Sequence, residues 1–133
     1  MGLAVGISEI VLACHDQART LAFYKDLLGF PLISPPDVPG PRFLRVADGA
    51  GGIPQMIVLV PLPAGSPPFS VSRPLHHLAL TLESADFDKQ ARVLRTAGLE
   101  IRTGAHPVIP SRTMYVTDPE GNEVEFICRR AET

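Results

Sequence analysis

Three ionisable side chains, Glu9, His77 and Glu125, each stand in a short stretch rich in Ile, Val, Leu or Phe. Such stretches are typical of β-strands, whose side chains point alternately to opposite faces. In each stretch the large apolar residues then share one face, and the ionisable residue lies on the other. Ionisable groups on a partly apolar surface are costly unless they are paired, protonated or bound to a cation. The pattern therefore predicts that all three face one cavity.

One His and two carboxylates form a donor set that suits a divalent ion such as Zn²⁺, Ni²⁺, Mn²⁺ or Fe²⁺. An ion with open positions can bind two adjacent substrate oxygens as a Lewis acid, and a carboxylate, Glu125 or Glu9, can shuttle a proton. The alternative for His77 and Glu125 is a hydrogen bond without metal, and the alternative for Glu9 is a partly exposed carboxylate at the start of a strand.

Two further polar residues, Arg112 and Tyr115, are candidates for binding a substrate. Both lie in a predicted strand over Arg112–Thr117 and alternate out of phase, so only one of them can face the cavity. Arg112 would anchor an anionic substrate. The two cysteines, Cys14 and Cys128, fall on the apolar faces and are interpreted as buried thiols.

A repeat supplies the elements that must position these residues. At an offset of 70 residues, Asp48 aligns with Asp118 and Gly51 with Gly121, and at nearly the same offset Gly29 aligns with Gly98. Each half reads as a strand, a helix and three more strands. The predicted strands are Ser8–Cys14, Phe30–Ser34, Arg42–Ala47 and Gln55–Pro61, then His76–Glu83, Leu99–Thr103, Arg112–Thr117 and Glu123–Cys128.

The helices carry recognisable end signals. Asp16 is a plausible N-cap for the first helix and Ser84 for the second, while Gly29 and Gly98 end them. The sequence thus predicts one α+β domain over residues 1–133, with module one at about 6–62, a Pro-rich linker at about 63–73 and module two at about 74–130. Two tandem βαβββ modules would form a curved, incompletely closed mixed β-sheet cavity flanked by helices.

Two motifs carry a resemblance to a known family. The stretch from Leu21 to Phe30 is similar to the "FY…LGF" helix end, and Asp118–Phe126 matches "DPxGNxxEF" of the glyoxalase / bleomycin-resistance / extradiol dioxygenase superfamily, also called vicinal oxygen chelate. The resemblance covers nearly the whole chain. It implies the tandem βαβββ fold and a metal held by one residue near the start and one in the last strand of each module.

Carried over residue by residue, the resemblance places the first metal position on Glu9, the third on His77 and the fourth on Glu125. Glu9 departs from the His that is more usual there. The second position is open, because the repeat offset points to Gln55 whereas the usual strand register points to Val58, which cannot ligate a metal.

The resemblance implies a glyoxalase-like, metal-dependent enzyme that acts on a small molecule by lyase or isomerase chemistry through an enediolate. A metal-free drug- or metabolite-binding protein of the bleomycin-resistance type is the alternative. An extradiol-type dioxygenase is less favoured, because such sites normally have two His. Relatives commonly pair, so a homodimer is expected, and the apolar loop Val71–Leu75 and the Pro-rich linker are possible contact surfaces.

Composition narrows the classes further. The chain is 45% apolar and 20% charged with a net charge of −2, which is typical of a globular protein without the basic excess that nucleic-acid binding needs. Its start does not resemble a signal peptide, no apolar run is long enough for a membrane span, and two cysteines cannot form a disulfide framework. We expect a cytoplasmic protein with a small-molecule partner.

Overall fold

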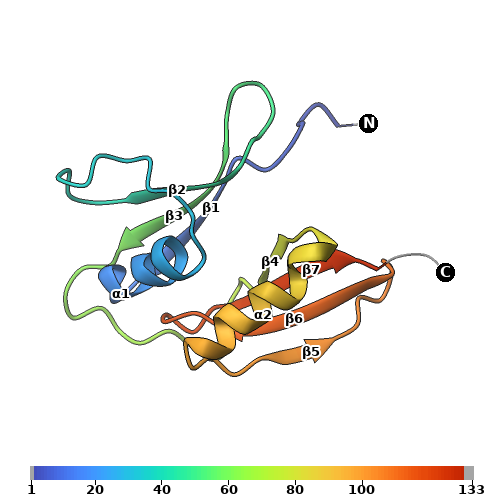
Figure 1. Ribbon diagram of the computed structural model, residues 1–133. Coiled ribbons are helices and arrows are strands. Elements are labelled where there is room, and N and C mark those ends of the chain that lie inside the picture. Colours follow the sequence, from blue (N-terminus) through green and yellow to red (C-terminus); the bar gives the residue numbers. More distant parts are fainter. Residues whose placement is uncertain (1, 131–133) are drawn as a thin grey trace. The chain divides into compact units, whose positions relative to one another are not determined.

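In the computed structural model, which describes residues 2–130, the chain divides into two units, Met1–Pro67 and Pro68–Thr133 (Figure 1). The division falls inside the predicted linker. Each unit combines one mixed sheet with one main helix, so the predicted α+β class is confirmed, and neither sheet of the described chain closes into a barrel. No helix within residues 2–130 is long and apolar enough to cross a membrane.

The first unit holds a three-stranded sheet in the order β1-β3-β2, in which β1 runs parallel to β3 and β2 antiparallel to it. A short α-helix continues directly into a π-helical segment that buries Phe23 and Tyr24. The elements are β1 (Glu9–Cys14), α1 (Gln17–Leu21), the π-helix (Ala22–Leu27), β2 (Arg42–Ala47) and β3 (Gln55–Pro61).

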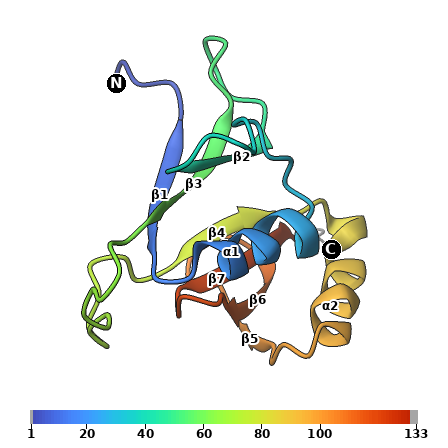
Figure 2. The same ribbon diagram turned by 90° about the vertical axis from the view of Figure 1, so that its left-hand side faces the viewer.

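The second unit holds a four-stranded sheet in the order β4-β7-β6-β5, with β4 parallel to β7 and the other pairs antiparallel. Helix α2 lies on one side of this sheet, as Figure 2 shows. The elements are β4 (Leu78–Thr81), a 3₁₀ turn (Ser84–Asp86), α2 (Phe87–Thr96), β5 (Arg102–Gly104), β6 (Ser111–Thr117) and β7 (Glu123–Arg129).

Three of the four predicted helix ends are confirmed. The Asp16 side chain accepts a hydrogen bond from the Arg19 N–H at 3.0 Å, as an N-cap does. Gly29 and Gly98 follow the two helices with φ of +82° and +85°, a backbone region that favours glycine. Ser84 was the wrong cap. Its hydroxyl donates instead to the Arg129 carbonyl at 2.7 Å and ties the start of the 3₁₀ turn to the end of β7.

The predicted strand Phe30–Ser34 is reduced to an isolated bridge between Leu32 and Leu44. Proline has no N–H to donate to a ladder, and Pro31 can only accept, which it does from the Arg45 N–H at 3.0 Å. Pro31 thus interrupts the strand pairing that the apolar pattern of this segment predicts. In the second unit the corresponding strand is short and shifted, and begins at Arg102.

The two faces of the second sheet have different roles. Val124, Phe126 and Cys128 are at most 1% exposed, as their predicted apolar face requires. Helix α2 contributes buried residues that complete this core, namely Phe87, Ala91 and Leu94. The opposite face carries Tyr115 of β6 and Glu123 and Glu125 of β7, and it is this face that holds the candidate site.

Candidate active site

His77 and Glu125 contact each other, with 3.1 Å between His77 Nε2 and Glu125 Oε1. Glu125 lies in the middle of β7, opposite Ala79 of β4 and Tyr115 of β6, and its side chain is only 5% exposed. His77 immediately precedes β4, and its side chain is 35% exposed. The structure therefore brings together two of the residues predicted from the sequence, a buried carboxylate and an accessible imidazole.

Tyr115 belongs to the same face, because it is paired with Glu125 across the β6–β7 ladder. Its ring meets the His77 ring edge-on, with 6.1 Å between the centroids. Burial raises the pKa of the Tyr115 phenol, and so do the charge of Glu125 and a hydrogen bond with its carboxylate. Tyr115 is therefore a neutral hydrogen-bond donor at neutral pH, beside a buried acceptor.

His76 precedes His77 and, like it, lies outside β4. Strand alternation would send it to the face opposite His77, but β4 begins only at Leu78, so alternation does not apply to either His. Their Nδ1 atoms lie 2.8 Å apart, within hydrogen-bonding distance. His76 is exposed and extends the site away from Glu125.

Arg112 lies on the helix side of the sheet rather than with Tyr115. Its guanidinium donates to the Asp88 carboxylate at 2.9 Å and stacks over the Phe87 ring, 4.3 Å from its centroid. The hydrogen bond that Arg112 donates, and then its charge, lower the pKa of Asp88. Of the two substrate-binding candidates, only Tyr115 lies on the face of Glu125, and the geometry gives no support to Arg112 as an anchor there.

The sheet registers show which residue of the first unit corresponds to Glu125. In each unit the first strand pairs in parallel with the last, and Ala79 opposite Glu125 corresponds to Val11 opposite Val58. Val58, which is 2% exposed, is thus the counterpart of Glu125. Gln55 lies at an odd spacing from Val58 in β3, so alternation sends it to the other face. The strand register thus differs from the 70-residue offset, which aligns Gln55 with Glu125.

Glu9 begins β1 of the first unit, is exposed, and shares a face with Val58 by the same alternation. Within neither unit do residues 2–130 bring three or more His, Cys, Asp or Glu side chains into a group that could hold a metal ion. Glu9 as a third ligand stays a prediction from the sequence.

His77 and Glu125 fit a divalent ion as two of its ligands. Metal–nitrogen and metal–oxygen bonds of about 2.0–2.2 Å separate two adjacent donor atoms by roughly 3 Å, and Nε2 and Oε1 lie 3.1 Å apart. The same distance suits a direct hydrogen bond. The two side chains can therefore bind a metal ion together, or form a hydrogen bond with each other when no metal is bound.

The first part of the Asp118–Phe126 motif, from Asp118 to Asn122, builds the β6–β7 turn, and its last part carries Glu125 on β7. The buried Asp118 carboxylate accepts hydrogen bonds, all at 2.9 Å, from the Glu120 N–H, the Asn122 N–H and the Asn122 side-chain amide. Asn122 and Glu120 in turn hold Arg73, whose guanidinium donates to Asn122 Oδ1 and the Glu120 carbonyl at 3.1 and 2.8 Å. The motif thus fixes a loop and one arginine.

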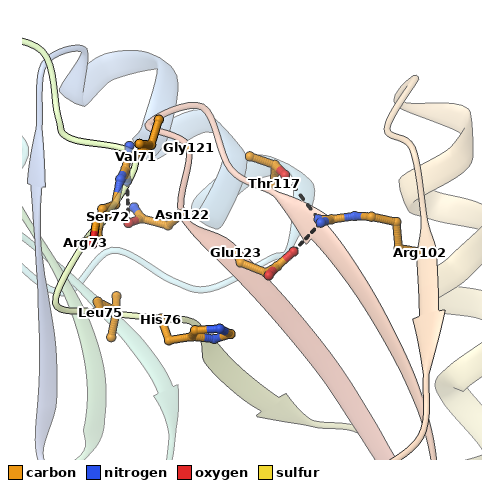
Figure 3. Close-up of a pocket in the computed structure, with 10 residues that line it drawn as sticks. All are labelled: Val71, Ser72, Arg73, Leu75, His76, Arg102, Thr117, Gly121, Asn122 and Glu123. Carbon is orange, nitrogen blue, oxygen red and sulfur yellow. Dashed lines mark hydrogen bonds and ion pairs between the residues drawn. The ribbon is translucent and has the colours of Figure 1, made fainter.

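A pocket of about 580 Å³ lies beside this turn (Figure 3). Arg73 and Asn122 form one of its walls, and Arg102, in an ion pair with Glu123, forms the other. Glu123 lies on the same face as Glu125, two residues away in β7, and His76 joins the pocket to the His77–Glu125 pair. The sequence did not predict this pocket, because its walls come from segments far apart in the chain.

A family model described as "Glyoxalase/Bleomycin resistance protein/Dioxygenase superfamily" matches residues 6–126. An iron-dependent extradiol dioxygenase of Rhodococcus jostii (strain RHA1) is 28% identical over 135 residues, which is 92% of this chain but 43% of that protein. The chain thus spans less than half of this relative.

Two solved structures show the same fold. A glyoxalase/dioxygenase from Nostoc punctiforme superposes with a TM-score of 0.75 at 22% identity, covering 95% of this chain and 92% of that one. TnmS3, an antibiotic binding protein from Streptomyces sp. CB03234, gives a TM-score of 0.65 at 21% identity, covering 98% of this chain and 100% of that one.

Proposed function

Because the chain belongs to the glyoxalase/bleomycin resistance protein/dioxygenase superfamily, we propose that it is a metal-dependent enzyme for a small molecule with two adjacent oxygens. His77 and Glu125 would hold the divalent ion, Zn²⁺, Ni²⁺, Mn²⁺ or Fe²⁺. The observation that carries the proposal is the 3.1 Å contact between an accessible imidazole and a buried carboxylate. A carboxylate is rarely buried unless it is paired or bound to a metal.

The bound ion would act as a Lewis acid that stabilises negative charge on the substrate oxygens. Glu125 is the group that would take up a proton, since its carboxylate is the acceptor at the centre of the face. Tyr115, neutral at neutral pH, would orient that carboxylate by donating a hydrogen bond to it. This division of roles matches lyase or isomerase chemistry through an enediolate.

A second candidate function is metal-free binding of a drug or metabolite. Val58 at the counterpart of Glu125 favours it, because an apolar side chain cannot ligate an ion. That one of the similar structures is an antibiotic binding protein accords with it. The similarity to an iron-dependent extradiol dioxygenase keeps oxygen chemistry as a third, less favoured possibility, with Glu9 where a second His would be usual.

The replacement Glu125→Gln separates the enzyme from the binding protein, once a substrate has been found in a panel of glutathione hemithioacetals, 2-substituted malonyl thioesters and catechols. In the enzyme, loss of the proton acceptor lowers kcat by at least about 10²-fold. In a binding protein no panel member turns over, and the variant only weakens binding. A planar aromatic drug that binds tightly to metal-free protein, with no turnover of the panel, would overturn the enzyme proposal.

A homodimer and a cytoplasmic location also remain predictions. Strand β4 forms one edge of its own sheet and β5 the other, and exposed edges are surfaces that a second chain can cover. Val71, in the loop proposed as a contact, is fully exposed within the described chain. Analytical ultracentrifugation that finds only monomer at all practical concentrations would contradict the dimer.

A further inference from the structure

The guanidinium of Arg73 is held by neutral groups. Its guanidinium donates to the Asn122 amide oxygen and the Glu120 carbonyl, and it stacks over the Phe69 ring at 4.6 Å. Within residues 2–130 these two are its only hydrogen bonds to protein and no carboxylate forms an ion pair with it. A guanidinium has five N–H donors, so three are left for a ligand.

Arg73 is also held in place before any ligand arrives. The turn that accepts its two hydrogen bonds is itself fixed by the buried Asp118. Gly121 allows the close approach, because a Cβ atom at that position would lie 2.8 Å from Arg73 Nη2, and its φ of +86° favours glycine. A pre-positioned guanidinium loses little conformational freedom when it binds, which favours affinity.

The charges around the pocket select the kind of ligand. Arg73 is on one wall, and on the other Arg102 is neutralised by its ion pair with Glu123 and also donates to the Thr117 hydroxyl at 3.2 Å. The ionised side chains of the lining thus carry one net positive charge when His76 is neutral. A single negative charge complements this lining, whereas the second charge of a dianion would find no unpaired cation among these residues. The volume, about 580 Å³, falls in the range of small-molecule sites.

We propose that this pocket binds a small organic monocarboxylate, whose carboxylate is held by Arg73 with help from the polar side chains of Ser72 and Asn122. A guanidinium matches a carboxylate because its parallel N–H groups can bond both oxygens. The pocket lies on the sheet face of Glu125, and His76 connects it to His77. Resting on the proposed function, the inference adds that the enzyme's substrate is a monocarboxylic acid.

Binding can be tested on the full chain freed of metal with a chelator, using benzoate as the probe and the isosteric neutral benzamide as its control. We expect titration followed by two-dimensional ¹H–¹⁵N NMR to shift pocket amides with benzoate, and benzamide to bind at least tenfold more weakly. Phthalate and inorganic phosphate, which carry more charge, should bind more weakly than benzoate.

The replacement Arg73→Gln should weaken benzoate at least tenfold, and Arg92→Gln provides a matched loss of one charge from an exposed position on α2. Arg73→Lys keeps the charge and should bind with intermediate affinity, so the test stands even where the Gln variant fails to fold. Equal binding of benzoate and benzamide, equal loss in the Arg92 variant, or no shifts at all would overturn the proposal. Because no metal is present, these outcomes are independent of turnover and of the metal site.

Discussion

The replacement Asp118→Ala tests whether the turn part of the family motif, from Asp118 to Asn122, is structural. Asp118 is 4% exposed, and its carboxylate accepts from two backbone N–H groups and from the Asn122 amide. Alanine removes all three bonds and leaves the donors in a buried turn without that acceptor. Through the same turn it also loosens the two bonds that hold Arg73.

The magnitude follows from these contacts. A hydrogen bond to a charged group contributes about 1.5–3 kcal/mol, but three bonds in one network are not additive and the turn can relax toward water. We therefore expect a loss of about 3–5 kcal/mol in the free energy of unfolding of the second unit. That is a large part of the roughly 5–15 kcal/mol typical of a natural domain.

The repeat supplies a matched control, because Asp48 aligns with Asp118 in the first unit. Its side chain is 90% exposed and pairs with Arg45, whose side chain is 41% exposed, so Asp48→Ala should change stability by no more than about 0.5 kcal/mol. Urea denaturation followed by circular dichroism, with hydrogen exchange of β6 and β7 amides as the local readout, measures both. Equal effects of the two replacements, or less than about 1 kcal/mol for Asp118→Ala, would refute the structural role.

Two pH-dependent effects follow from the remaining contacts. Because Arg112 lowers the pKa of Asp88, the pair stabilises the fold above the ordinary carboxyl pKa and loses this contribution as the pH falls through the lowered pKa. The difference in stability between wild type and Asp88→Asn should therefore vanish in acid. A difference that stays constant with pH would contradict this expectation. In a background whose other tyrosine is replaced by Phe, the raised pKa of Tyr115 should appear in ultraviolet titration as a phenolate midpoint above that of an ordinary tyrosine. Stability should then fall as the pH rises past the pKa of the unfolded chain. The replacement Glu125→Gln should lower that midpoint, and no change would contradict the contact.

Local signals in the sequence predicted much of the fold. Apolar alternation located β1, β6 and β7, and a capping side chain or a terminal glycine located the helix ends. The errors arose where tertiary pairing overrode a local pattern. Pro31 interrupts a strand that its apolar neighbours favour. The Ser84 hydroxyl, instead of capping a helix, donates a hydrogen bond to the carbonyl of Arg129, 45 residues further along the chain.

The candidate site was predictable only in part, for the same reason. Alternation placed Glu125 on the polar face, but it could not place His77, which precedes its strand, or decide between Arg112 and Tyr115, because the phase of a strand is set by its partners. No periodic pattern in the sequence identifies Arg73, because its two hydrogen-bond partners lie 47 and 49 residues further along the chain. Such long-range contacts need the folded chain.

Titration of the purified, chelator-treated chain with Zn²⁺, Ni²⁺, Mn²⁺ and Fe²⁺ tests the central claim most directly. We predict that wild type binds one divalent ion, that His77→Ala loses it, and that His76→Ala, which changes the neighbouring imidazole, keeps it. Anomalous scattering from crystals soaked with the ion should then place it between His77 Nε2 and Glu125 Oε1. Binding no tighter than about millimolar, which corresponds to roughly −4 kcal/mol, or binding unaffected by His77→Ala, would contradict the metal site.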